Sequence, residues 1–304
     1  MKPNSIKYFI PVLAGVFIAL HFQSCDVIDG STRENNASID TTCTFDADTT
    51  PIRKKVLMED YTGYLCGNCP QAGIYLNDTL APIYGDSLVV ISVHAAFFAI
   101  PCGLPGGACP GTQPAGSFQT DFRCPAGEDW YDQFNIPTNP LGLVNRAAYG
   151  TSNFFVPKSK WATKINDEFA VAPEAKIRIK NTYDPATRNL RICIESKFLS
   201  SVIDTFNLQV VLIEDSLIDW QLWYNHSPEY VPDYIHRHVL RQSVNGSFGP
   251  TIASGNISAG QTVVNGYNLT LNSSWAAPNC KVVAFIYDAD NYRVLQVEEA
   301  DVIE

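Results

Sequence analysis

Beyond its N-terminal segment, the sequence lacks any apolar run that approaches the ~20 residues needed to cross a bilayer as a helix. It also lacks an excess of positive charge, because 21 Lys and Arg residues stand against 31 Asp and Glu residues, for a formal net charge of −10. Acidic chains are poor partners for nucleic acid, whose phosphates attract basic surfaces. We therefore expect a protein that neither spans a membrane nor binds nucleic acid.

The N-terminus has the pattern of a secretory signal. An apolar run from Tyr8 to Phe22 follows a short basic segment, and Cys25 comes directly after the small residue Ser24. A cysteine at this place is typical of bacterial lipoproteins, in which it becomes the lipidated first residue of the mature chain. The alternative is a secreted protein with a free Cys25. We expect a signal peptide over residues 1–24 and a chain that is lipid-anchored to the outer membrane, on its periplasmic or cell-surface face.

Two kinds of segment follow the anchor. Residues 25–51 are polar and nearly free of large apolar side chains, which predicts a flexible tether. In residues 52–172 the pattern alternates between strand and helix. An apolar run begins at Val56, a helix is predicted over 70–84, and the continuous apolar run 87–93 predicts a buried, parallel strand.

The order of elements determines the fold class that we expect for residues 52–172. A short strand over 141–145 is followed by a helix over 158–170, which places Trp161 and Ile165 on one face. Strand, helix, strand, then further strands and a closing helix is a thioredoxin-like order. The sequence therefore predicts an α/β thioredoxin-like domain.

β patterns dominate residues 173–304, where turn clusters such as 184–187 and 288–291 separate apolar, alternating runs. This pattern predicts an all-β antiparallel sandwich of the immunoglobulin-like kind. The expected strands cover residues 175–183, 190–199, 206–214, 262–271, 281–287 and 293–297.

The motif Cys66-Gly-Asn-Cys69, followed by Pro70, has the C-x-x-C spacing of a dithiol redox site. With the second cysteine in the first turn of a helix, the two sulfurs lie close enough to form a bridge. Proline suits that turn because no hydrogen bond of its nitrogen is needed there. In such a site Cys66 attacks a substrate disulfide and Cys69 resolves the mixed disulfide.

Several residues are candidates for supporting this dithiol. In the thioredoxin family a buried acid at the position of Asp60 exchanges protons with the resolving cysteine, although a strand-end carboxylate satisfied by backbone or solvent is an equal alternative. Glu59, on the opposite strand face, is the runner-up. The family's cis-proline loop corresponds to Pro140 or Pro137, and we favour Pro140 because it directly precedes a strand. His94 ends the neighbouring strand, where it could tune the dithiol.

Roughly thirty residues, 99–128, are inserted before the proline loop and are rich in Gly and Pro. They have too few apolar residues to pack alone, so we expect disulfides to staple them, with Cys43 of the tether as a candidate fourth partner. In the β-domain, Cys193 and Cys280 either form a bridge with each other or are two buried thiols, and these alternatives are equal. The sequence does not choose among the pairings of Cys43, Cys102, Cys109, Cys124, Cys193 and Cys280.

The dithiol together with a histidine is also a candidate metal site, since Cys and His hold zinc or copper. His236 and His238 alternate onto one strand face, and His226 lies ten residues earlier. No second C-x-x-C motif is present, however, and paired strand histidines are more often structural. We expect no metal and no other cofactor.

The segments Glu59–Gly63, Cys66–Pro70 and Pro140–Arg146 resemble the outer membrane protein 28 family of Bacteroidota lipoproteins. His236–Arg241 and Val282–Tyr287 resemble the C-terminal domain of that family. The resemblance covers nearly all of the mature chain. It implies an outer-membrane lipoprotein with a thioredoxin-like domain followed by a β-domain.

Two functions compete. The first is thiol-disulfide exchange on exported proteins, as an oxidoreductase or isomerase. The second is a non-catalytic binding or adhesion protein, or an accessory subunit of an outer-membrane complex, in which Cys66–Cys69 is a structural bridge. Leu65 stands where an aromatic residue usually precedes the first cysteine. The exposure of Cys66 discriminates between the two, because a catalytic dithiol must be reachable by a protein disulfide.

Overall fold

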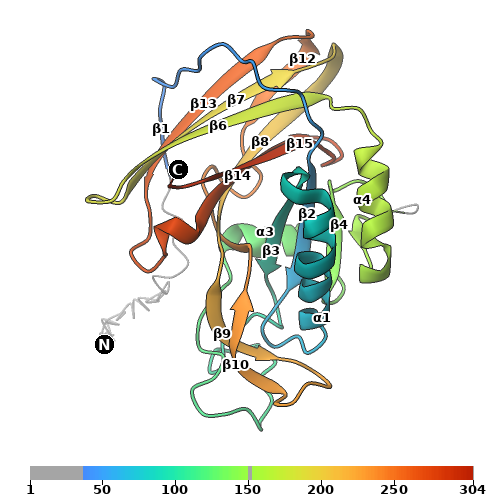
Figure 1. The fold of residues 1–304 in the computed structure, drawn as a ribbon, viewed down its shortest axis with the longest axis vertical. Coiled ribbons are helices and arrows are strands. Elements are labelled where there is room, and N and C mark those ends of the chain that lie inside the picture. The colour runs from blue at the N-terminus through green and yellow to red at the C-terminus, as the bar shows by residue number, and fades with distance from the viewer. Residues whose placement is uncertain (1–36, 150–152, 304) are drawn as a thin grey trace, which may run out of the picture. The chain divides into compact units, whose positions relative to one another are not determined.

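β-Strands make up most of the fold, which the computed structural model describes for residues 37–149 and 153–303 (Figure 1). The predicted signal peptide and the lipidation site Cys25 lie outside the described residues. Within the described ranges, no helix is both long enough and apolar enough to span a membrane.

One end of a nine-stranded sheet comes from the first half of the chain. β2 (Val56–Thr62) pairs in parallel with β3 (Leu88–His94), and β4 (Leu141–Val144) pairs antiparallel to β2 and to the short β5 (Phe155–Val156). β2, β3 and β4 consist almost wholly of buried residues. The continuous apolar runs in the sequence therefore reflect strands that are covered on both faces.

Helices cover both faces of this part of the sheet. On one face α1 (Cys69–Ile74) continues through a π-helical stretch (Tyr75–Leu80) into α2 (Ala81–Tyr84) and packs beside α4 (Trp161–Phe169). α3 (Pro125–Gln133) packs on the other face. The two helices that the sequence predicts in this half are thus present, and α3 begins within the predicted insertion.

The second half builds an antiparallel sandwich, as predicted. A four-stranded sheet in the order β1-β13-β7-β6 packs against the strands β8, β14 and β15 of the nine-stranded sheet, and the core between them is apolar. The six predicted strands correspond to β6 (Ala175–Asp184), β7 (Asn189–Phe198), β8 (Val202–Glu214), β13 (Thr262–Thr270), β14 (Cys280–Asp288) and β15 (Val294–Asp301).

The two predicted domains, residues 52–172 and 173–304, share one sheet. β11 (Val239–Ser243) lies between their strands, because it pairs in parallel with β3 and antiparallel with β8. β12 (Thr251–Ile257) pairs with β8 as well. Hydrogen bonding is therefore continuous across the predicted boundary, which no local pattern in the sequence indicated.

A buried ion pair lies where these two halves meet. The guanidinium of Arg146 donates to both carboxylate oxygens of Glu59, at 2.9 and 2.7 Å, and both side chains are fully buried. Aromatic rings from α3, from the residue that follows it and from β14 surround the cation, with ring centroids 4.6 Å away for Trp130 and 4.9 Å for both Phe134 and Phe285. Cation–π attraction therefore joins the two halves, in addition to the sheet that they share.

Residues 37–51 differ from the flexible tether that their composition predicts. β1 (Ser38–Ile39) adds to the edge of β13, Cys43 forms a disulfide with Cys193 of β7, and Asp48 pairs with Lys176 at 2.6 Å. This stretch is nearly free of large apolar side chains. It is attached to the sandwich instead by polar side chains that pair with charged residues and by one disulfide.

Candidate functional site

Cys66 and Cys69 form a disulfide at the junction of β2 and α1, with sulfurs 2.04 Å and Cα atoms 5.4 Å apart. The Cys66 N–H donates to the carbonyl of Gly63 at 2.9 Å, and the Cys69 N–H donates to the carbonyl of Cys66 at 3.0 Å. These bonds form the tight turn in which α1 begins. Cys69 is the first residue of the helix and Pro70 the second, as the motif predicts.

Both cysteines are buried, each with only 3% of its surface exposed. A hairpin of β9 (Leu217–Leu222) and β10 (Tyr230–His236) lies over them, at the end of the molecule where α1 begins (Figure 1). We call this hairpin, residues 217–236, the cap. The N–H of Leu222 donates to the carbonyl of Tyr64, and the N–H of Tyr224 donates to that of Gly67, both at 2.8 Å.

Side chains of the cap complete the cover. The buried Gln221 amide donates to the carbonyls of Cys66 at 3.2 Å and Gly63 at 3.4 Å. The Tyr224 ring lies so close to Gly67 that a Cβ at that position would be 2.5 Å from it. The glycine inside the C-x-x-C motif is therefore required by the cap, since any side chain there would displace the ring.

A small cavity of about 30 Å³ lies beside the disulfide, lined by Asp60, Cys69, His94, Tyr234 and His236 among others. Asp60 Oδ1 and His94 Nδ1 are buried, and neither atom has a hydrogen-bond partner among the described residues. A cavity of this size and polarity can hold one water molecule. Three predicted site residues, Asp60, Cys69 and His94, are thus brought together, and the cap adds two more.

Burial shifts the protonation equilibria in this cavity. It raises the pKa of Asp60 to about 7, since the ionised carboxylate loses its hydration. It also lowers the pKa of His236 to about 4 and that of His94 well below its usual value. At neutral pH both imidazoles are neutral, and Asp60 is an acid that can hold or release a proton.

The other predicted site residues lie apart from the cavity. Glu59 is on the opposite face of β2, as strand alternation predicts, and its carboxylate is bound by Arg146. The cis peptide bond of the proline loop precedes Pro140, whereas the bond before Pro137 is trans. The Asn139 amide donates to the carbonyl of Thr62 at 2.9 Å, which holds this loop beside the end of β2.

The cysteine pairing differs in part from what the sequence led us to expect. Cys102 and Cys109 form a disulfide within the insertion, but Cys43 pairs with Cys193 of the sandwich and not with the insertion. A bridge between the two β-domain cysteines is thereby excluded. The thiol of Cys280 is buried, which raises its pKa to about 12, and Cys124 is buried too.

The insertion and the cap enclose the loop before the first cysteine. Tyr64 and Leu65 are buried in a cluster with Phe118 and Phe122 of the insertion and Leu222 of the cap. Tyr64 stacks on Phe118 with ring centroids 5.5 Å apart. Leu65, which stands where an aromatic residue usually precedes the first cysteine, therefore packs in the interior of this chain.

The strand histidines separate in the structure. His236 lines the cavity with its ring 5.4 Å from that of His94, while His238 lies 3.0 Å from the Asn77 amide oxygen. His226 stacks on Trp223. The three histidines of residues 226–238 thus lie in three different places, and only His236 lies beside Cys69 and His94.

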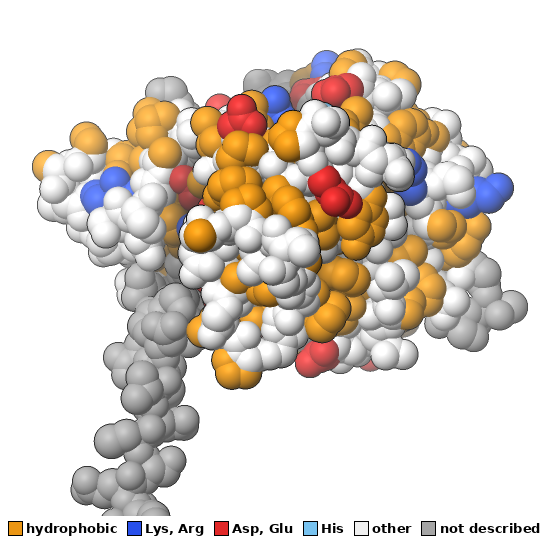
Figure 2. All heavy atoms as spheres, turned by 90° about the horizontal axis from the view of Figure 1, so that it is seen from below, with side chains coloured by type: hydrophobic (Ala, Val, Ile, Leu, Met, Phe, Trp, Pro, Cys, Tyr) orange, Lys and Arg blue, Asp and Glu red, His pale blue; other side chains and the backbone are white. Residues whose placement is uncertain are grey.

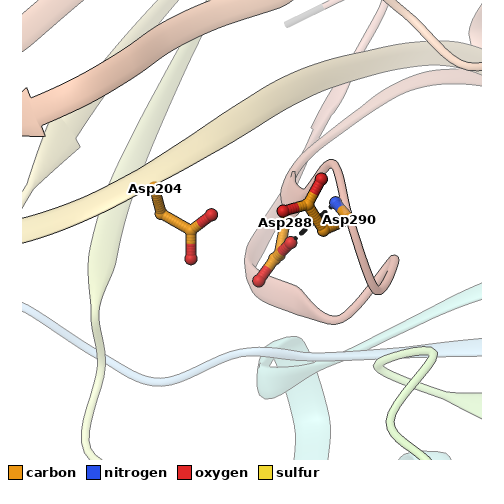
Figure 3. A group of neighbouring side chains, drawn as sticks. All are labelled: Asp204, Asp288 and Asp290. Carbon is orange, nitrogen blue, oxygen red and sulfur yellow. Dashed lines mark hydrogen bonds between the residues drawn. The ribbon is translucent and has the colours of Figure 1, made fainter.

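A group of three carboxylates lies elsewhere, on the sandwich (Figure 3). Asp204, Asp288 and Asp290 each place an oxygen within 4.8 Å of the others, and among the described residues no other such group of acids, His or Cys occurs. The Asp288 carboxylate already accepts the N–H groups of Asp290 and Asn291, at 2.8 and 3.2 Å. These contacts order the turn between β14 and β15.

Sequence reasoning missed Gln221, Tyr224 and Tyr234, the cap residues that cover the disulfide and its cavity. β9 and β10 were not predicted as strands, so nothing indicated that this segment returns to the C-x-x-C motif. His236 was noticed only as one of a pair of strand histidines. The single available signal was the Gly67 of the motif, which leaves room for another part of the chain.

Comparison with known proteins gives one family and a weak structural similarity. The family model for outer membrane protein Omp28 matches residues 128–304. Among solved structures, a domain of the outer membrane lipoprotein Omp28 from Porphyromonas gingivalis is 19% identical, over 42% of this chain and 88% of that one, with a TM-score of 0.28. No curated protein matches the sequence. The family match includes the cap and the sandwich, and it begins beyond the C-x-x-C motif.

Proposed function

Since the chain belongs to the Omp28 family of outer membrane proteins, we propose that it is an outer-membrane lipoprotein, lipidated on Cys25, in which residues 52–172 are a thioredoxin-like unit. The parallel β2–β3 pair, the antiparallel β4, the helices on both faces and the cis bond before Pro140 support the thioredoxin-like assignment. The apolar N-terminal run that ends at Ser24 supports the anchor.

The proposed role of this unit is binding, to exported proteins or to an outer-membrane complex, with Cys66–Cys69 as a structural bridge. The observation that carries the proposal is the 3% exposure of each cysteine, because a protein disulfide cannot reach a sulfur beneath the cap. Figure 2 views the molecule from below, and hydrophobic side chains gather across the middle of the face that it shows. Exposed apolar surface of this kind supports an interaction role.

The reduction potential of the Cys66–Cys69 pair tests this proposal. The soluble form, without residues 1–24, is equilibrated in graded thiol buffers, trapped by alkylation and analysed by mass spectrometry. We expect a potential below about −300 mV, in the range of structural bridges, and no mixed disulfides with periplasmic proteins. A potential between about −120 and −270 mV, the range of working oxidoreductases, would contradict a purely structural bridge.

A second candidate function is thiol-disulfide exchange, and the cavity beside Cys69 favours it. In this reaction the Cys66 thiolate attacks a substrate disulfide and expels one substrate thiolate. Cys69 then attacks the mixed disulfide and releases the second, which leaves Cys66–Cys69 oxidised and the substrate reduced. Asp60, with a pKa raised to about 7, would accept the Cys69 proton. The variant Cys69→Ala would then accumulate mixed disulfides, with Cys66→Ala as the matched control.

A further inference from the structure

The cap leaves the sheet between two strands that are direct neighbours. β8 ends at Glu214 and β11 begins at Val239, and these two residues face each other in register. β9 and β10 pair with one another as a two-stranded sheet of their own. The whole cap is therefore an excursion of the chain that begins and returns at the same place in the nine-stranded sheet.

Both roots of the cap have an unusual backbone conformation. Ser216 has φ of 59° and His238 has φ of 54°, values that residues other than glycine adopt infrequently. Ser216 directly precedes β9 and His238 directly precedes β11, so both lie in the short segments that connect the cap to the sheet. They turn the cap away from the direction of β8 and β11, and their position is that of a hinge, where a few backbone angles set the orientation of a whole segment.

The cap binds the motif as an incoming strand would. The N–H groups that donate to Tyr64 and Gly67 belong to alternate residues, Leu222 at the end of β9 and Tyr224 in the turn that follows, and both point toward the motif. The N–H of the residue between them, Trp223, points the other way and pairs with the carbonyl of Glu229 within the hairpin at 2.8 Å. Main-chain recognition of this kind is independent of side-chain identity, so any extended polypeptide could use the same two carbonyl acceptors.

We propose that the cap is a hinged cover that occupies a binding site for an extended polypeptide strand over Cys66–Cys69. A thiol or a polypeptide reaches the bridge only when the cap swings away on Ser216 and His238. This inference rests on the proposed thiol exchange only for its biological use, because the cover would control access to the bridge whether or not the bridge is catalytic.

Several kinds of contact hold the cap closed: an apolar cluster of Leu222 and Trp220 with Phe118, the two main-chain hydrogen bonds, and side chains at the disulfide loop. Gln221 supplies side-chain hydrogen bonds to the loop, and the Tyr224 ring lies on Gly67. Farther out, the Tyr230 hydroxyl lies 2.7 Å from the Thr112 hydroxyl of the insertion. The insertion thus supports the cap from the side, while Gln221 and Tyr224 attach it to the disulfide loop itself.

The test compares the rate at which a small thiol reduces Cys66–Cys69 in the oxidised protein and in the double variant Gln221→Ala/Tyr224→Ala. The reaction is quenched by alkylation and the peptides are resolved by mass spectrometry. The matched control is Ile218→Ala, in the cap strand β9 but 70% exposed. Cys43–Cys193 is an internal control, because global unfolding would expose both bridges and cap opening exposes only one.

We expect the small thiol to reduce Cys66–Cys69 at least about tenfold faster in the double variant than in the parent, as the loss of two or three weak contacts implies. The rate at Cys43–Cys193 and the rates in Ile218→Ala should stay unchanged. Equal rates in the double variant and the parent, or a parallel increase at both bridges, would overturn the inference.

Hydrogen exchange of the unmodified protein gives a second measurement, which does not depend on whether the double variant folds. The amides of Leu222 and Tyr224 should exchange together and faster than those of β8, through an opening that leaves the sheet intact. Exchange of these amides only with global unfolding would also refute the hinge. The double variant could show faster reduction of Cys66–Cys69 while the reduction potential of this pair lies in the structural range. That result would support the cover and contradict thiol exchange, so the two proposals can fail separately.

Discussion

Replacement of Asp60 by Asn should remove a pH dependence of folding stability that burial of this carboxyl creates. Burial raises the pKa of Asp60 from 3.8 to about 7. The folded protein therefore binds more protons than the unfolded chain in this window, and its stability falls as the pH rises from about 4 to 7. A shift of this size corresponds to a loss of about 4 kcal/mol above pH 7, at 1.36 kcal/mol per pH unit.

The imidazoles in the same cavity act in the opposite direction. Burial lowers the pKa of His94 and His236, so the stability that their neutral forms contribute is lost as the pH falls below about 6.5. Tyr234, whose pKa burial raises to about 12, stays neutral throughout. Arg237 also lines the cavity. Because these groups are common to both proteins, the difference between Asp60→Asn and the parent isolates the carboxyl.

The assay is urea unfolding of the oxidised proteins between pH 4.5 and 9. The free energy of unfolding of Asp60→Asn, minus that of the parent, should grow by about 3 kcal/mol over this range, most of it by pH 8, since about 1 kcal/mol of the effect is already lost at pH 4.5. Asp233→Asn, which replaces an exposed acid of β10, is the control and should give no such trend. Parallel profiles for Asp60→Asn and the parent would show that the carboxyl is not desolvated, and the cavity assignment would fail.

Three further predictions concern stability, each measured by chemical unfolding. The parent loses stability as the pH falls from about 6.5 to 4, because burial lowers the pKa of His236 to about 4, and His236→Gln should reduce this loss by about 3 kcal/mol. An equal loss in the variant and the parent would contradict the burial of this histidine. Arg146→Met should destabilise by about 3–5 kcal/mol, since it leaves the Glu59 carboxylate buried without its cation, and Arg146→Met/Glu59→Leu should recover most of this; no recovery would refute the explanation. Cys43→Ser should cost up to about 5 kcal/mol, the loop entropy of a link spanning 150 residues, whereas an unaffected midpoint would mean that the stretch is not anchored.

The strands and helices that the sequence predicts correctly are those with a strong local pattern. β2 and β3 have continuous apolar runs, and β6 and β7 have alternating runs. These patterns indicate burial directly, because a strand covered on two faces is apolar throughout, whereas one covered on a single face alternates between apolar and polar residues. β11 has no such signature. Its five residues include Arg241 and Gln242, and only its neighbours in space, β3 and β8, make it a strand in the middle of a sheet.

The same distinction separates the parts of the site that could be predicted from those that could not. Cys66, Cys69 and Asp60 lie within ten residues of one another, so their geometry follows from one strand and one helix turn. Composition failed for residues 37–51, because a polar stretch was interpreted as unable to pack. Charged partners and Cys193, far along the chain, supply what local sequence could not show.

The cap shows why a motif alone could not establish the function. The C-x-x-C spacing determines that two sulfurs can bridge, and the structure agrees, but reactivity depends on what lies above them. Here the cover comes from residues more than 150 positions away, through main-chain donors that leave no trace in side-chain identity. Gly67 is the local mark of that long-range contact, since only its missing Cβ admits the Tyr224 ring. A motif glycine of this kind therefore indicates that another segment of the chain approaches the dithiol, and exposure of the sulfurs has to be measured before the dithiol is assigned a catalytic role.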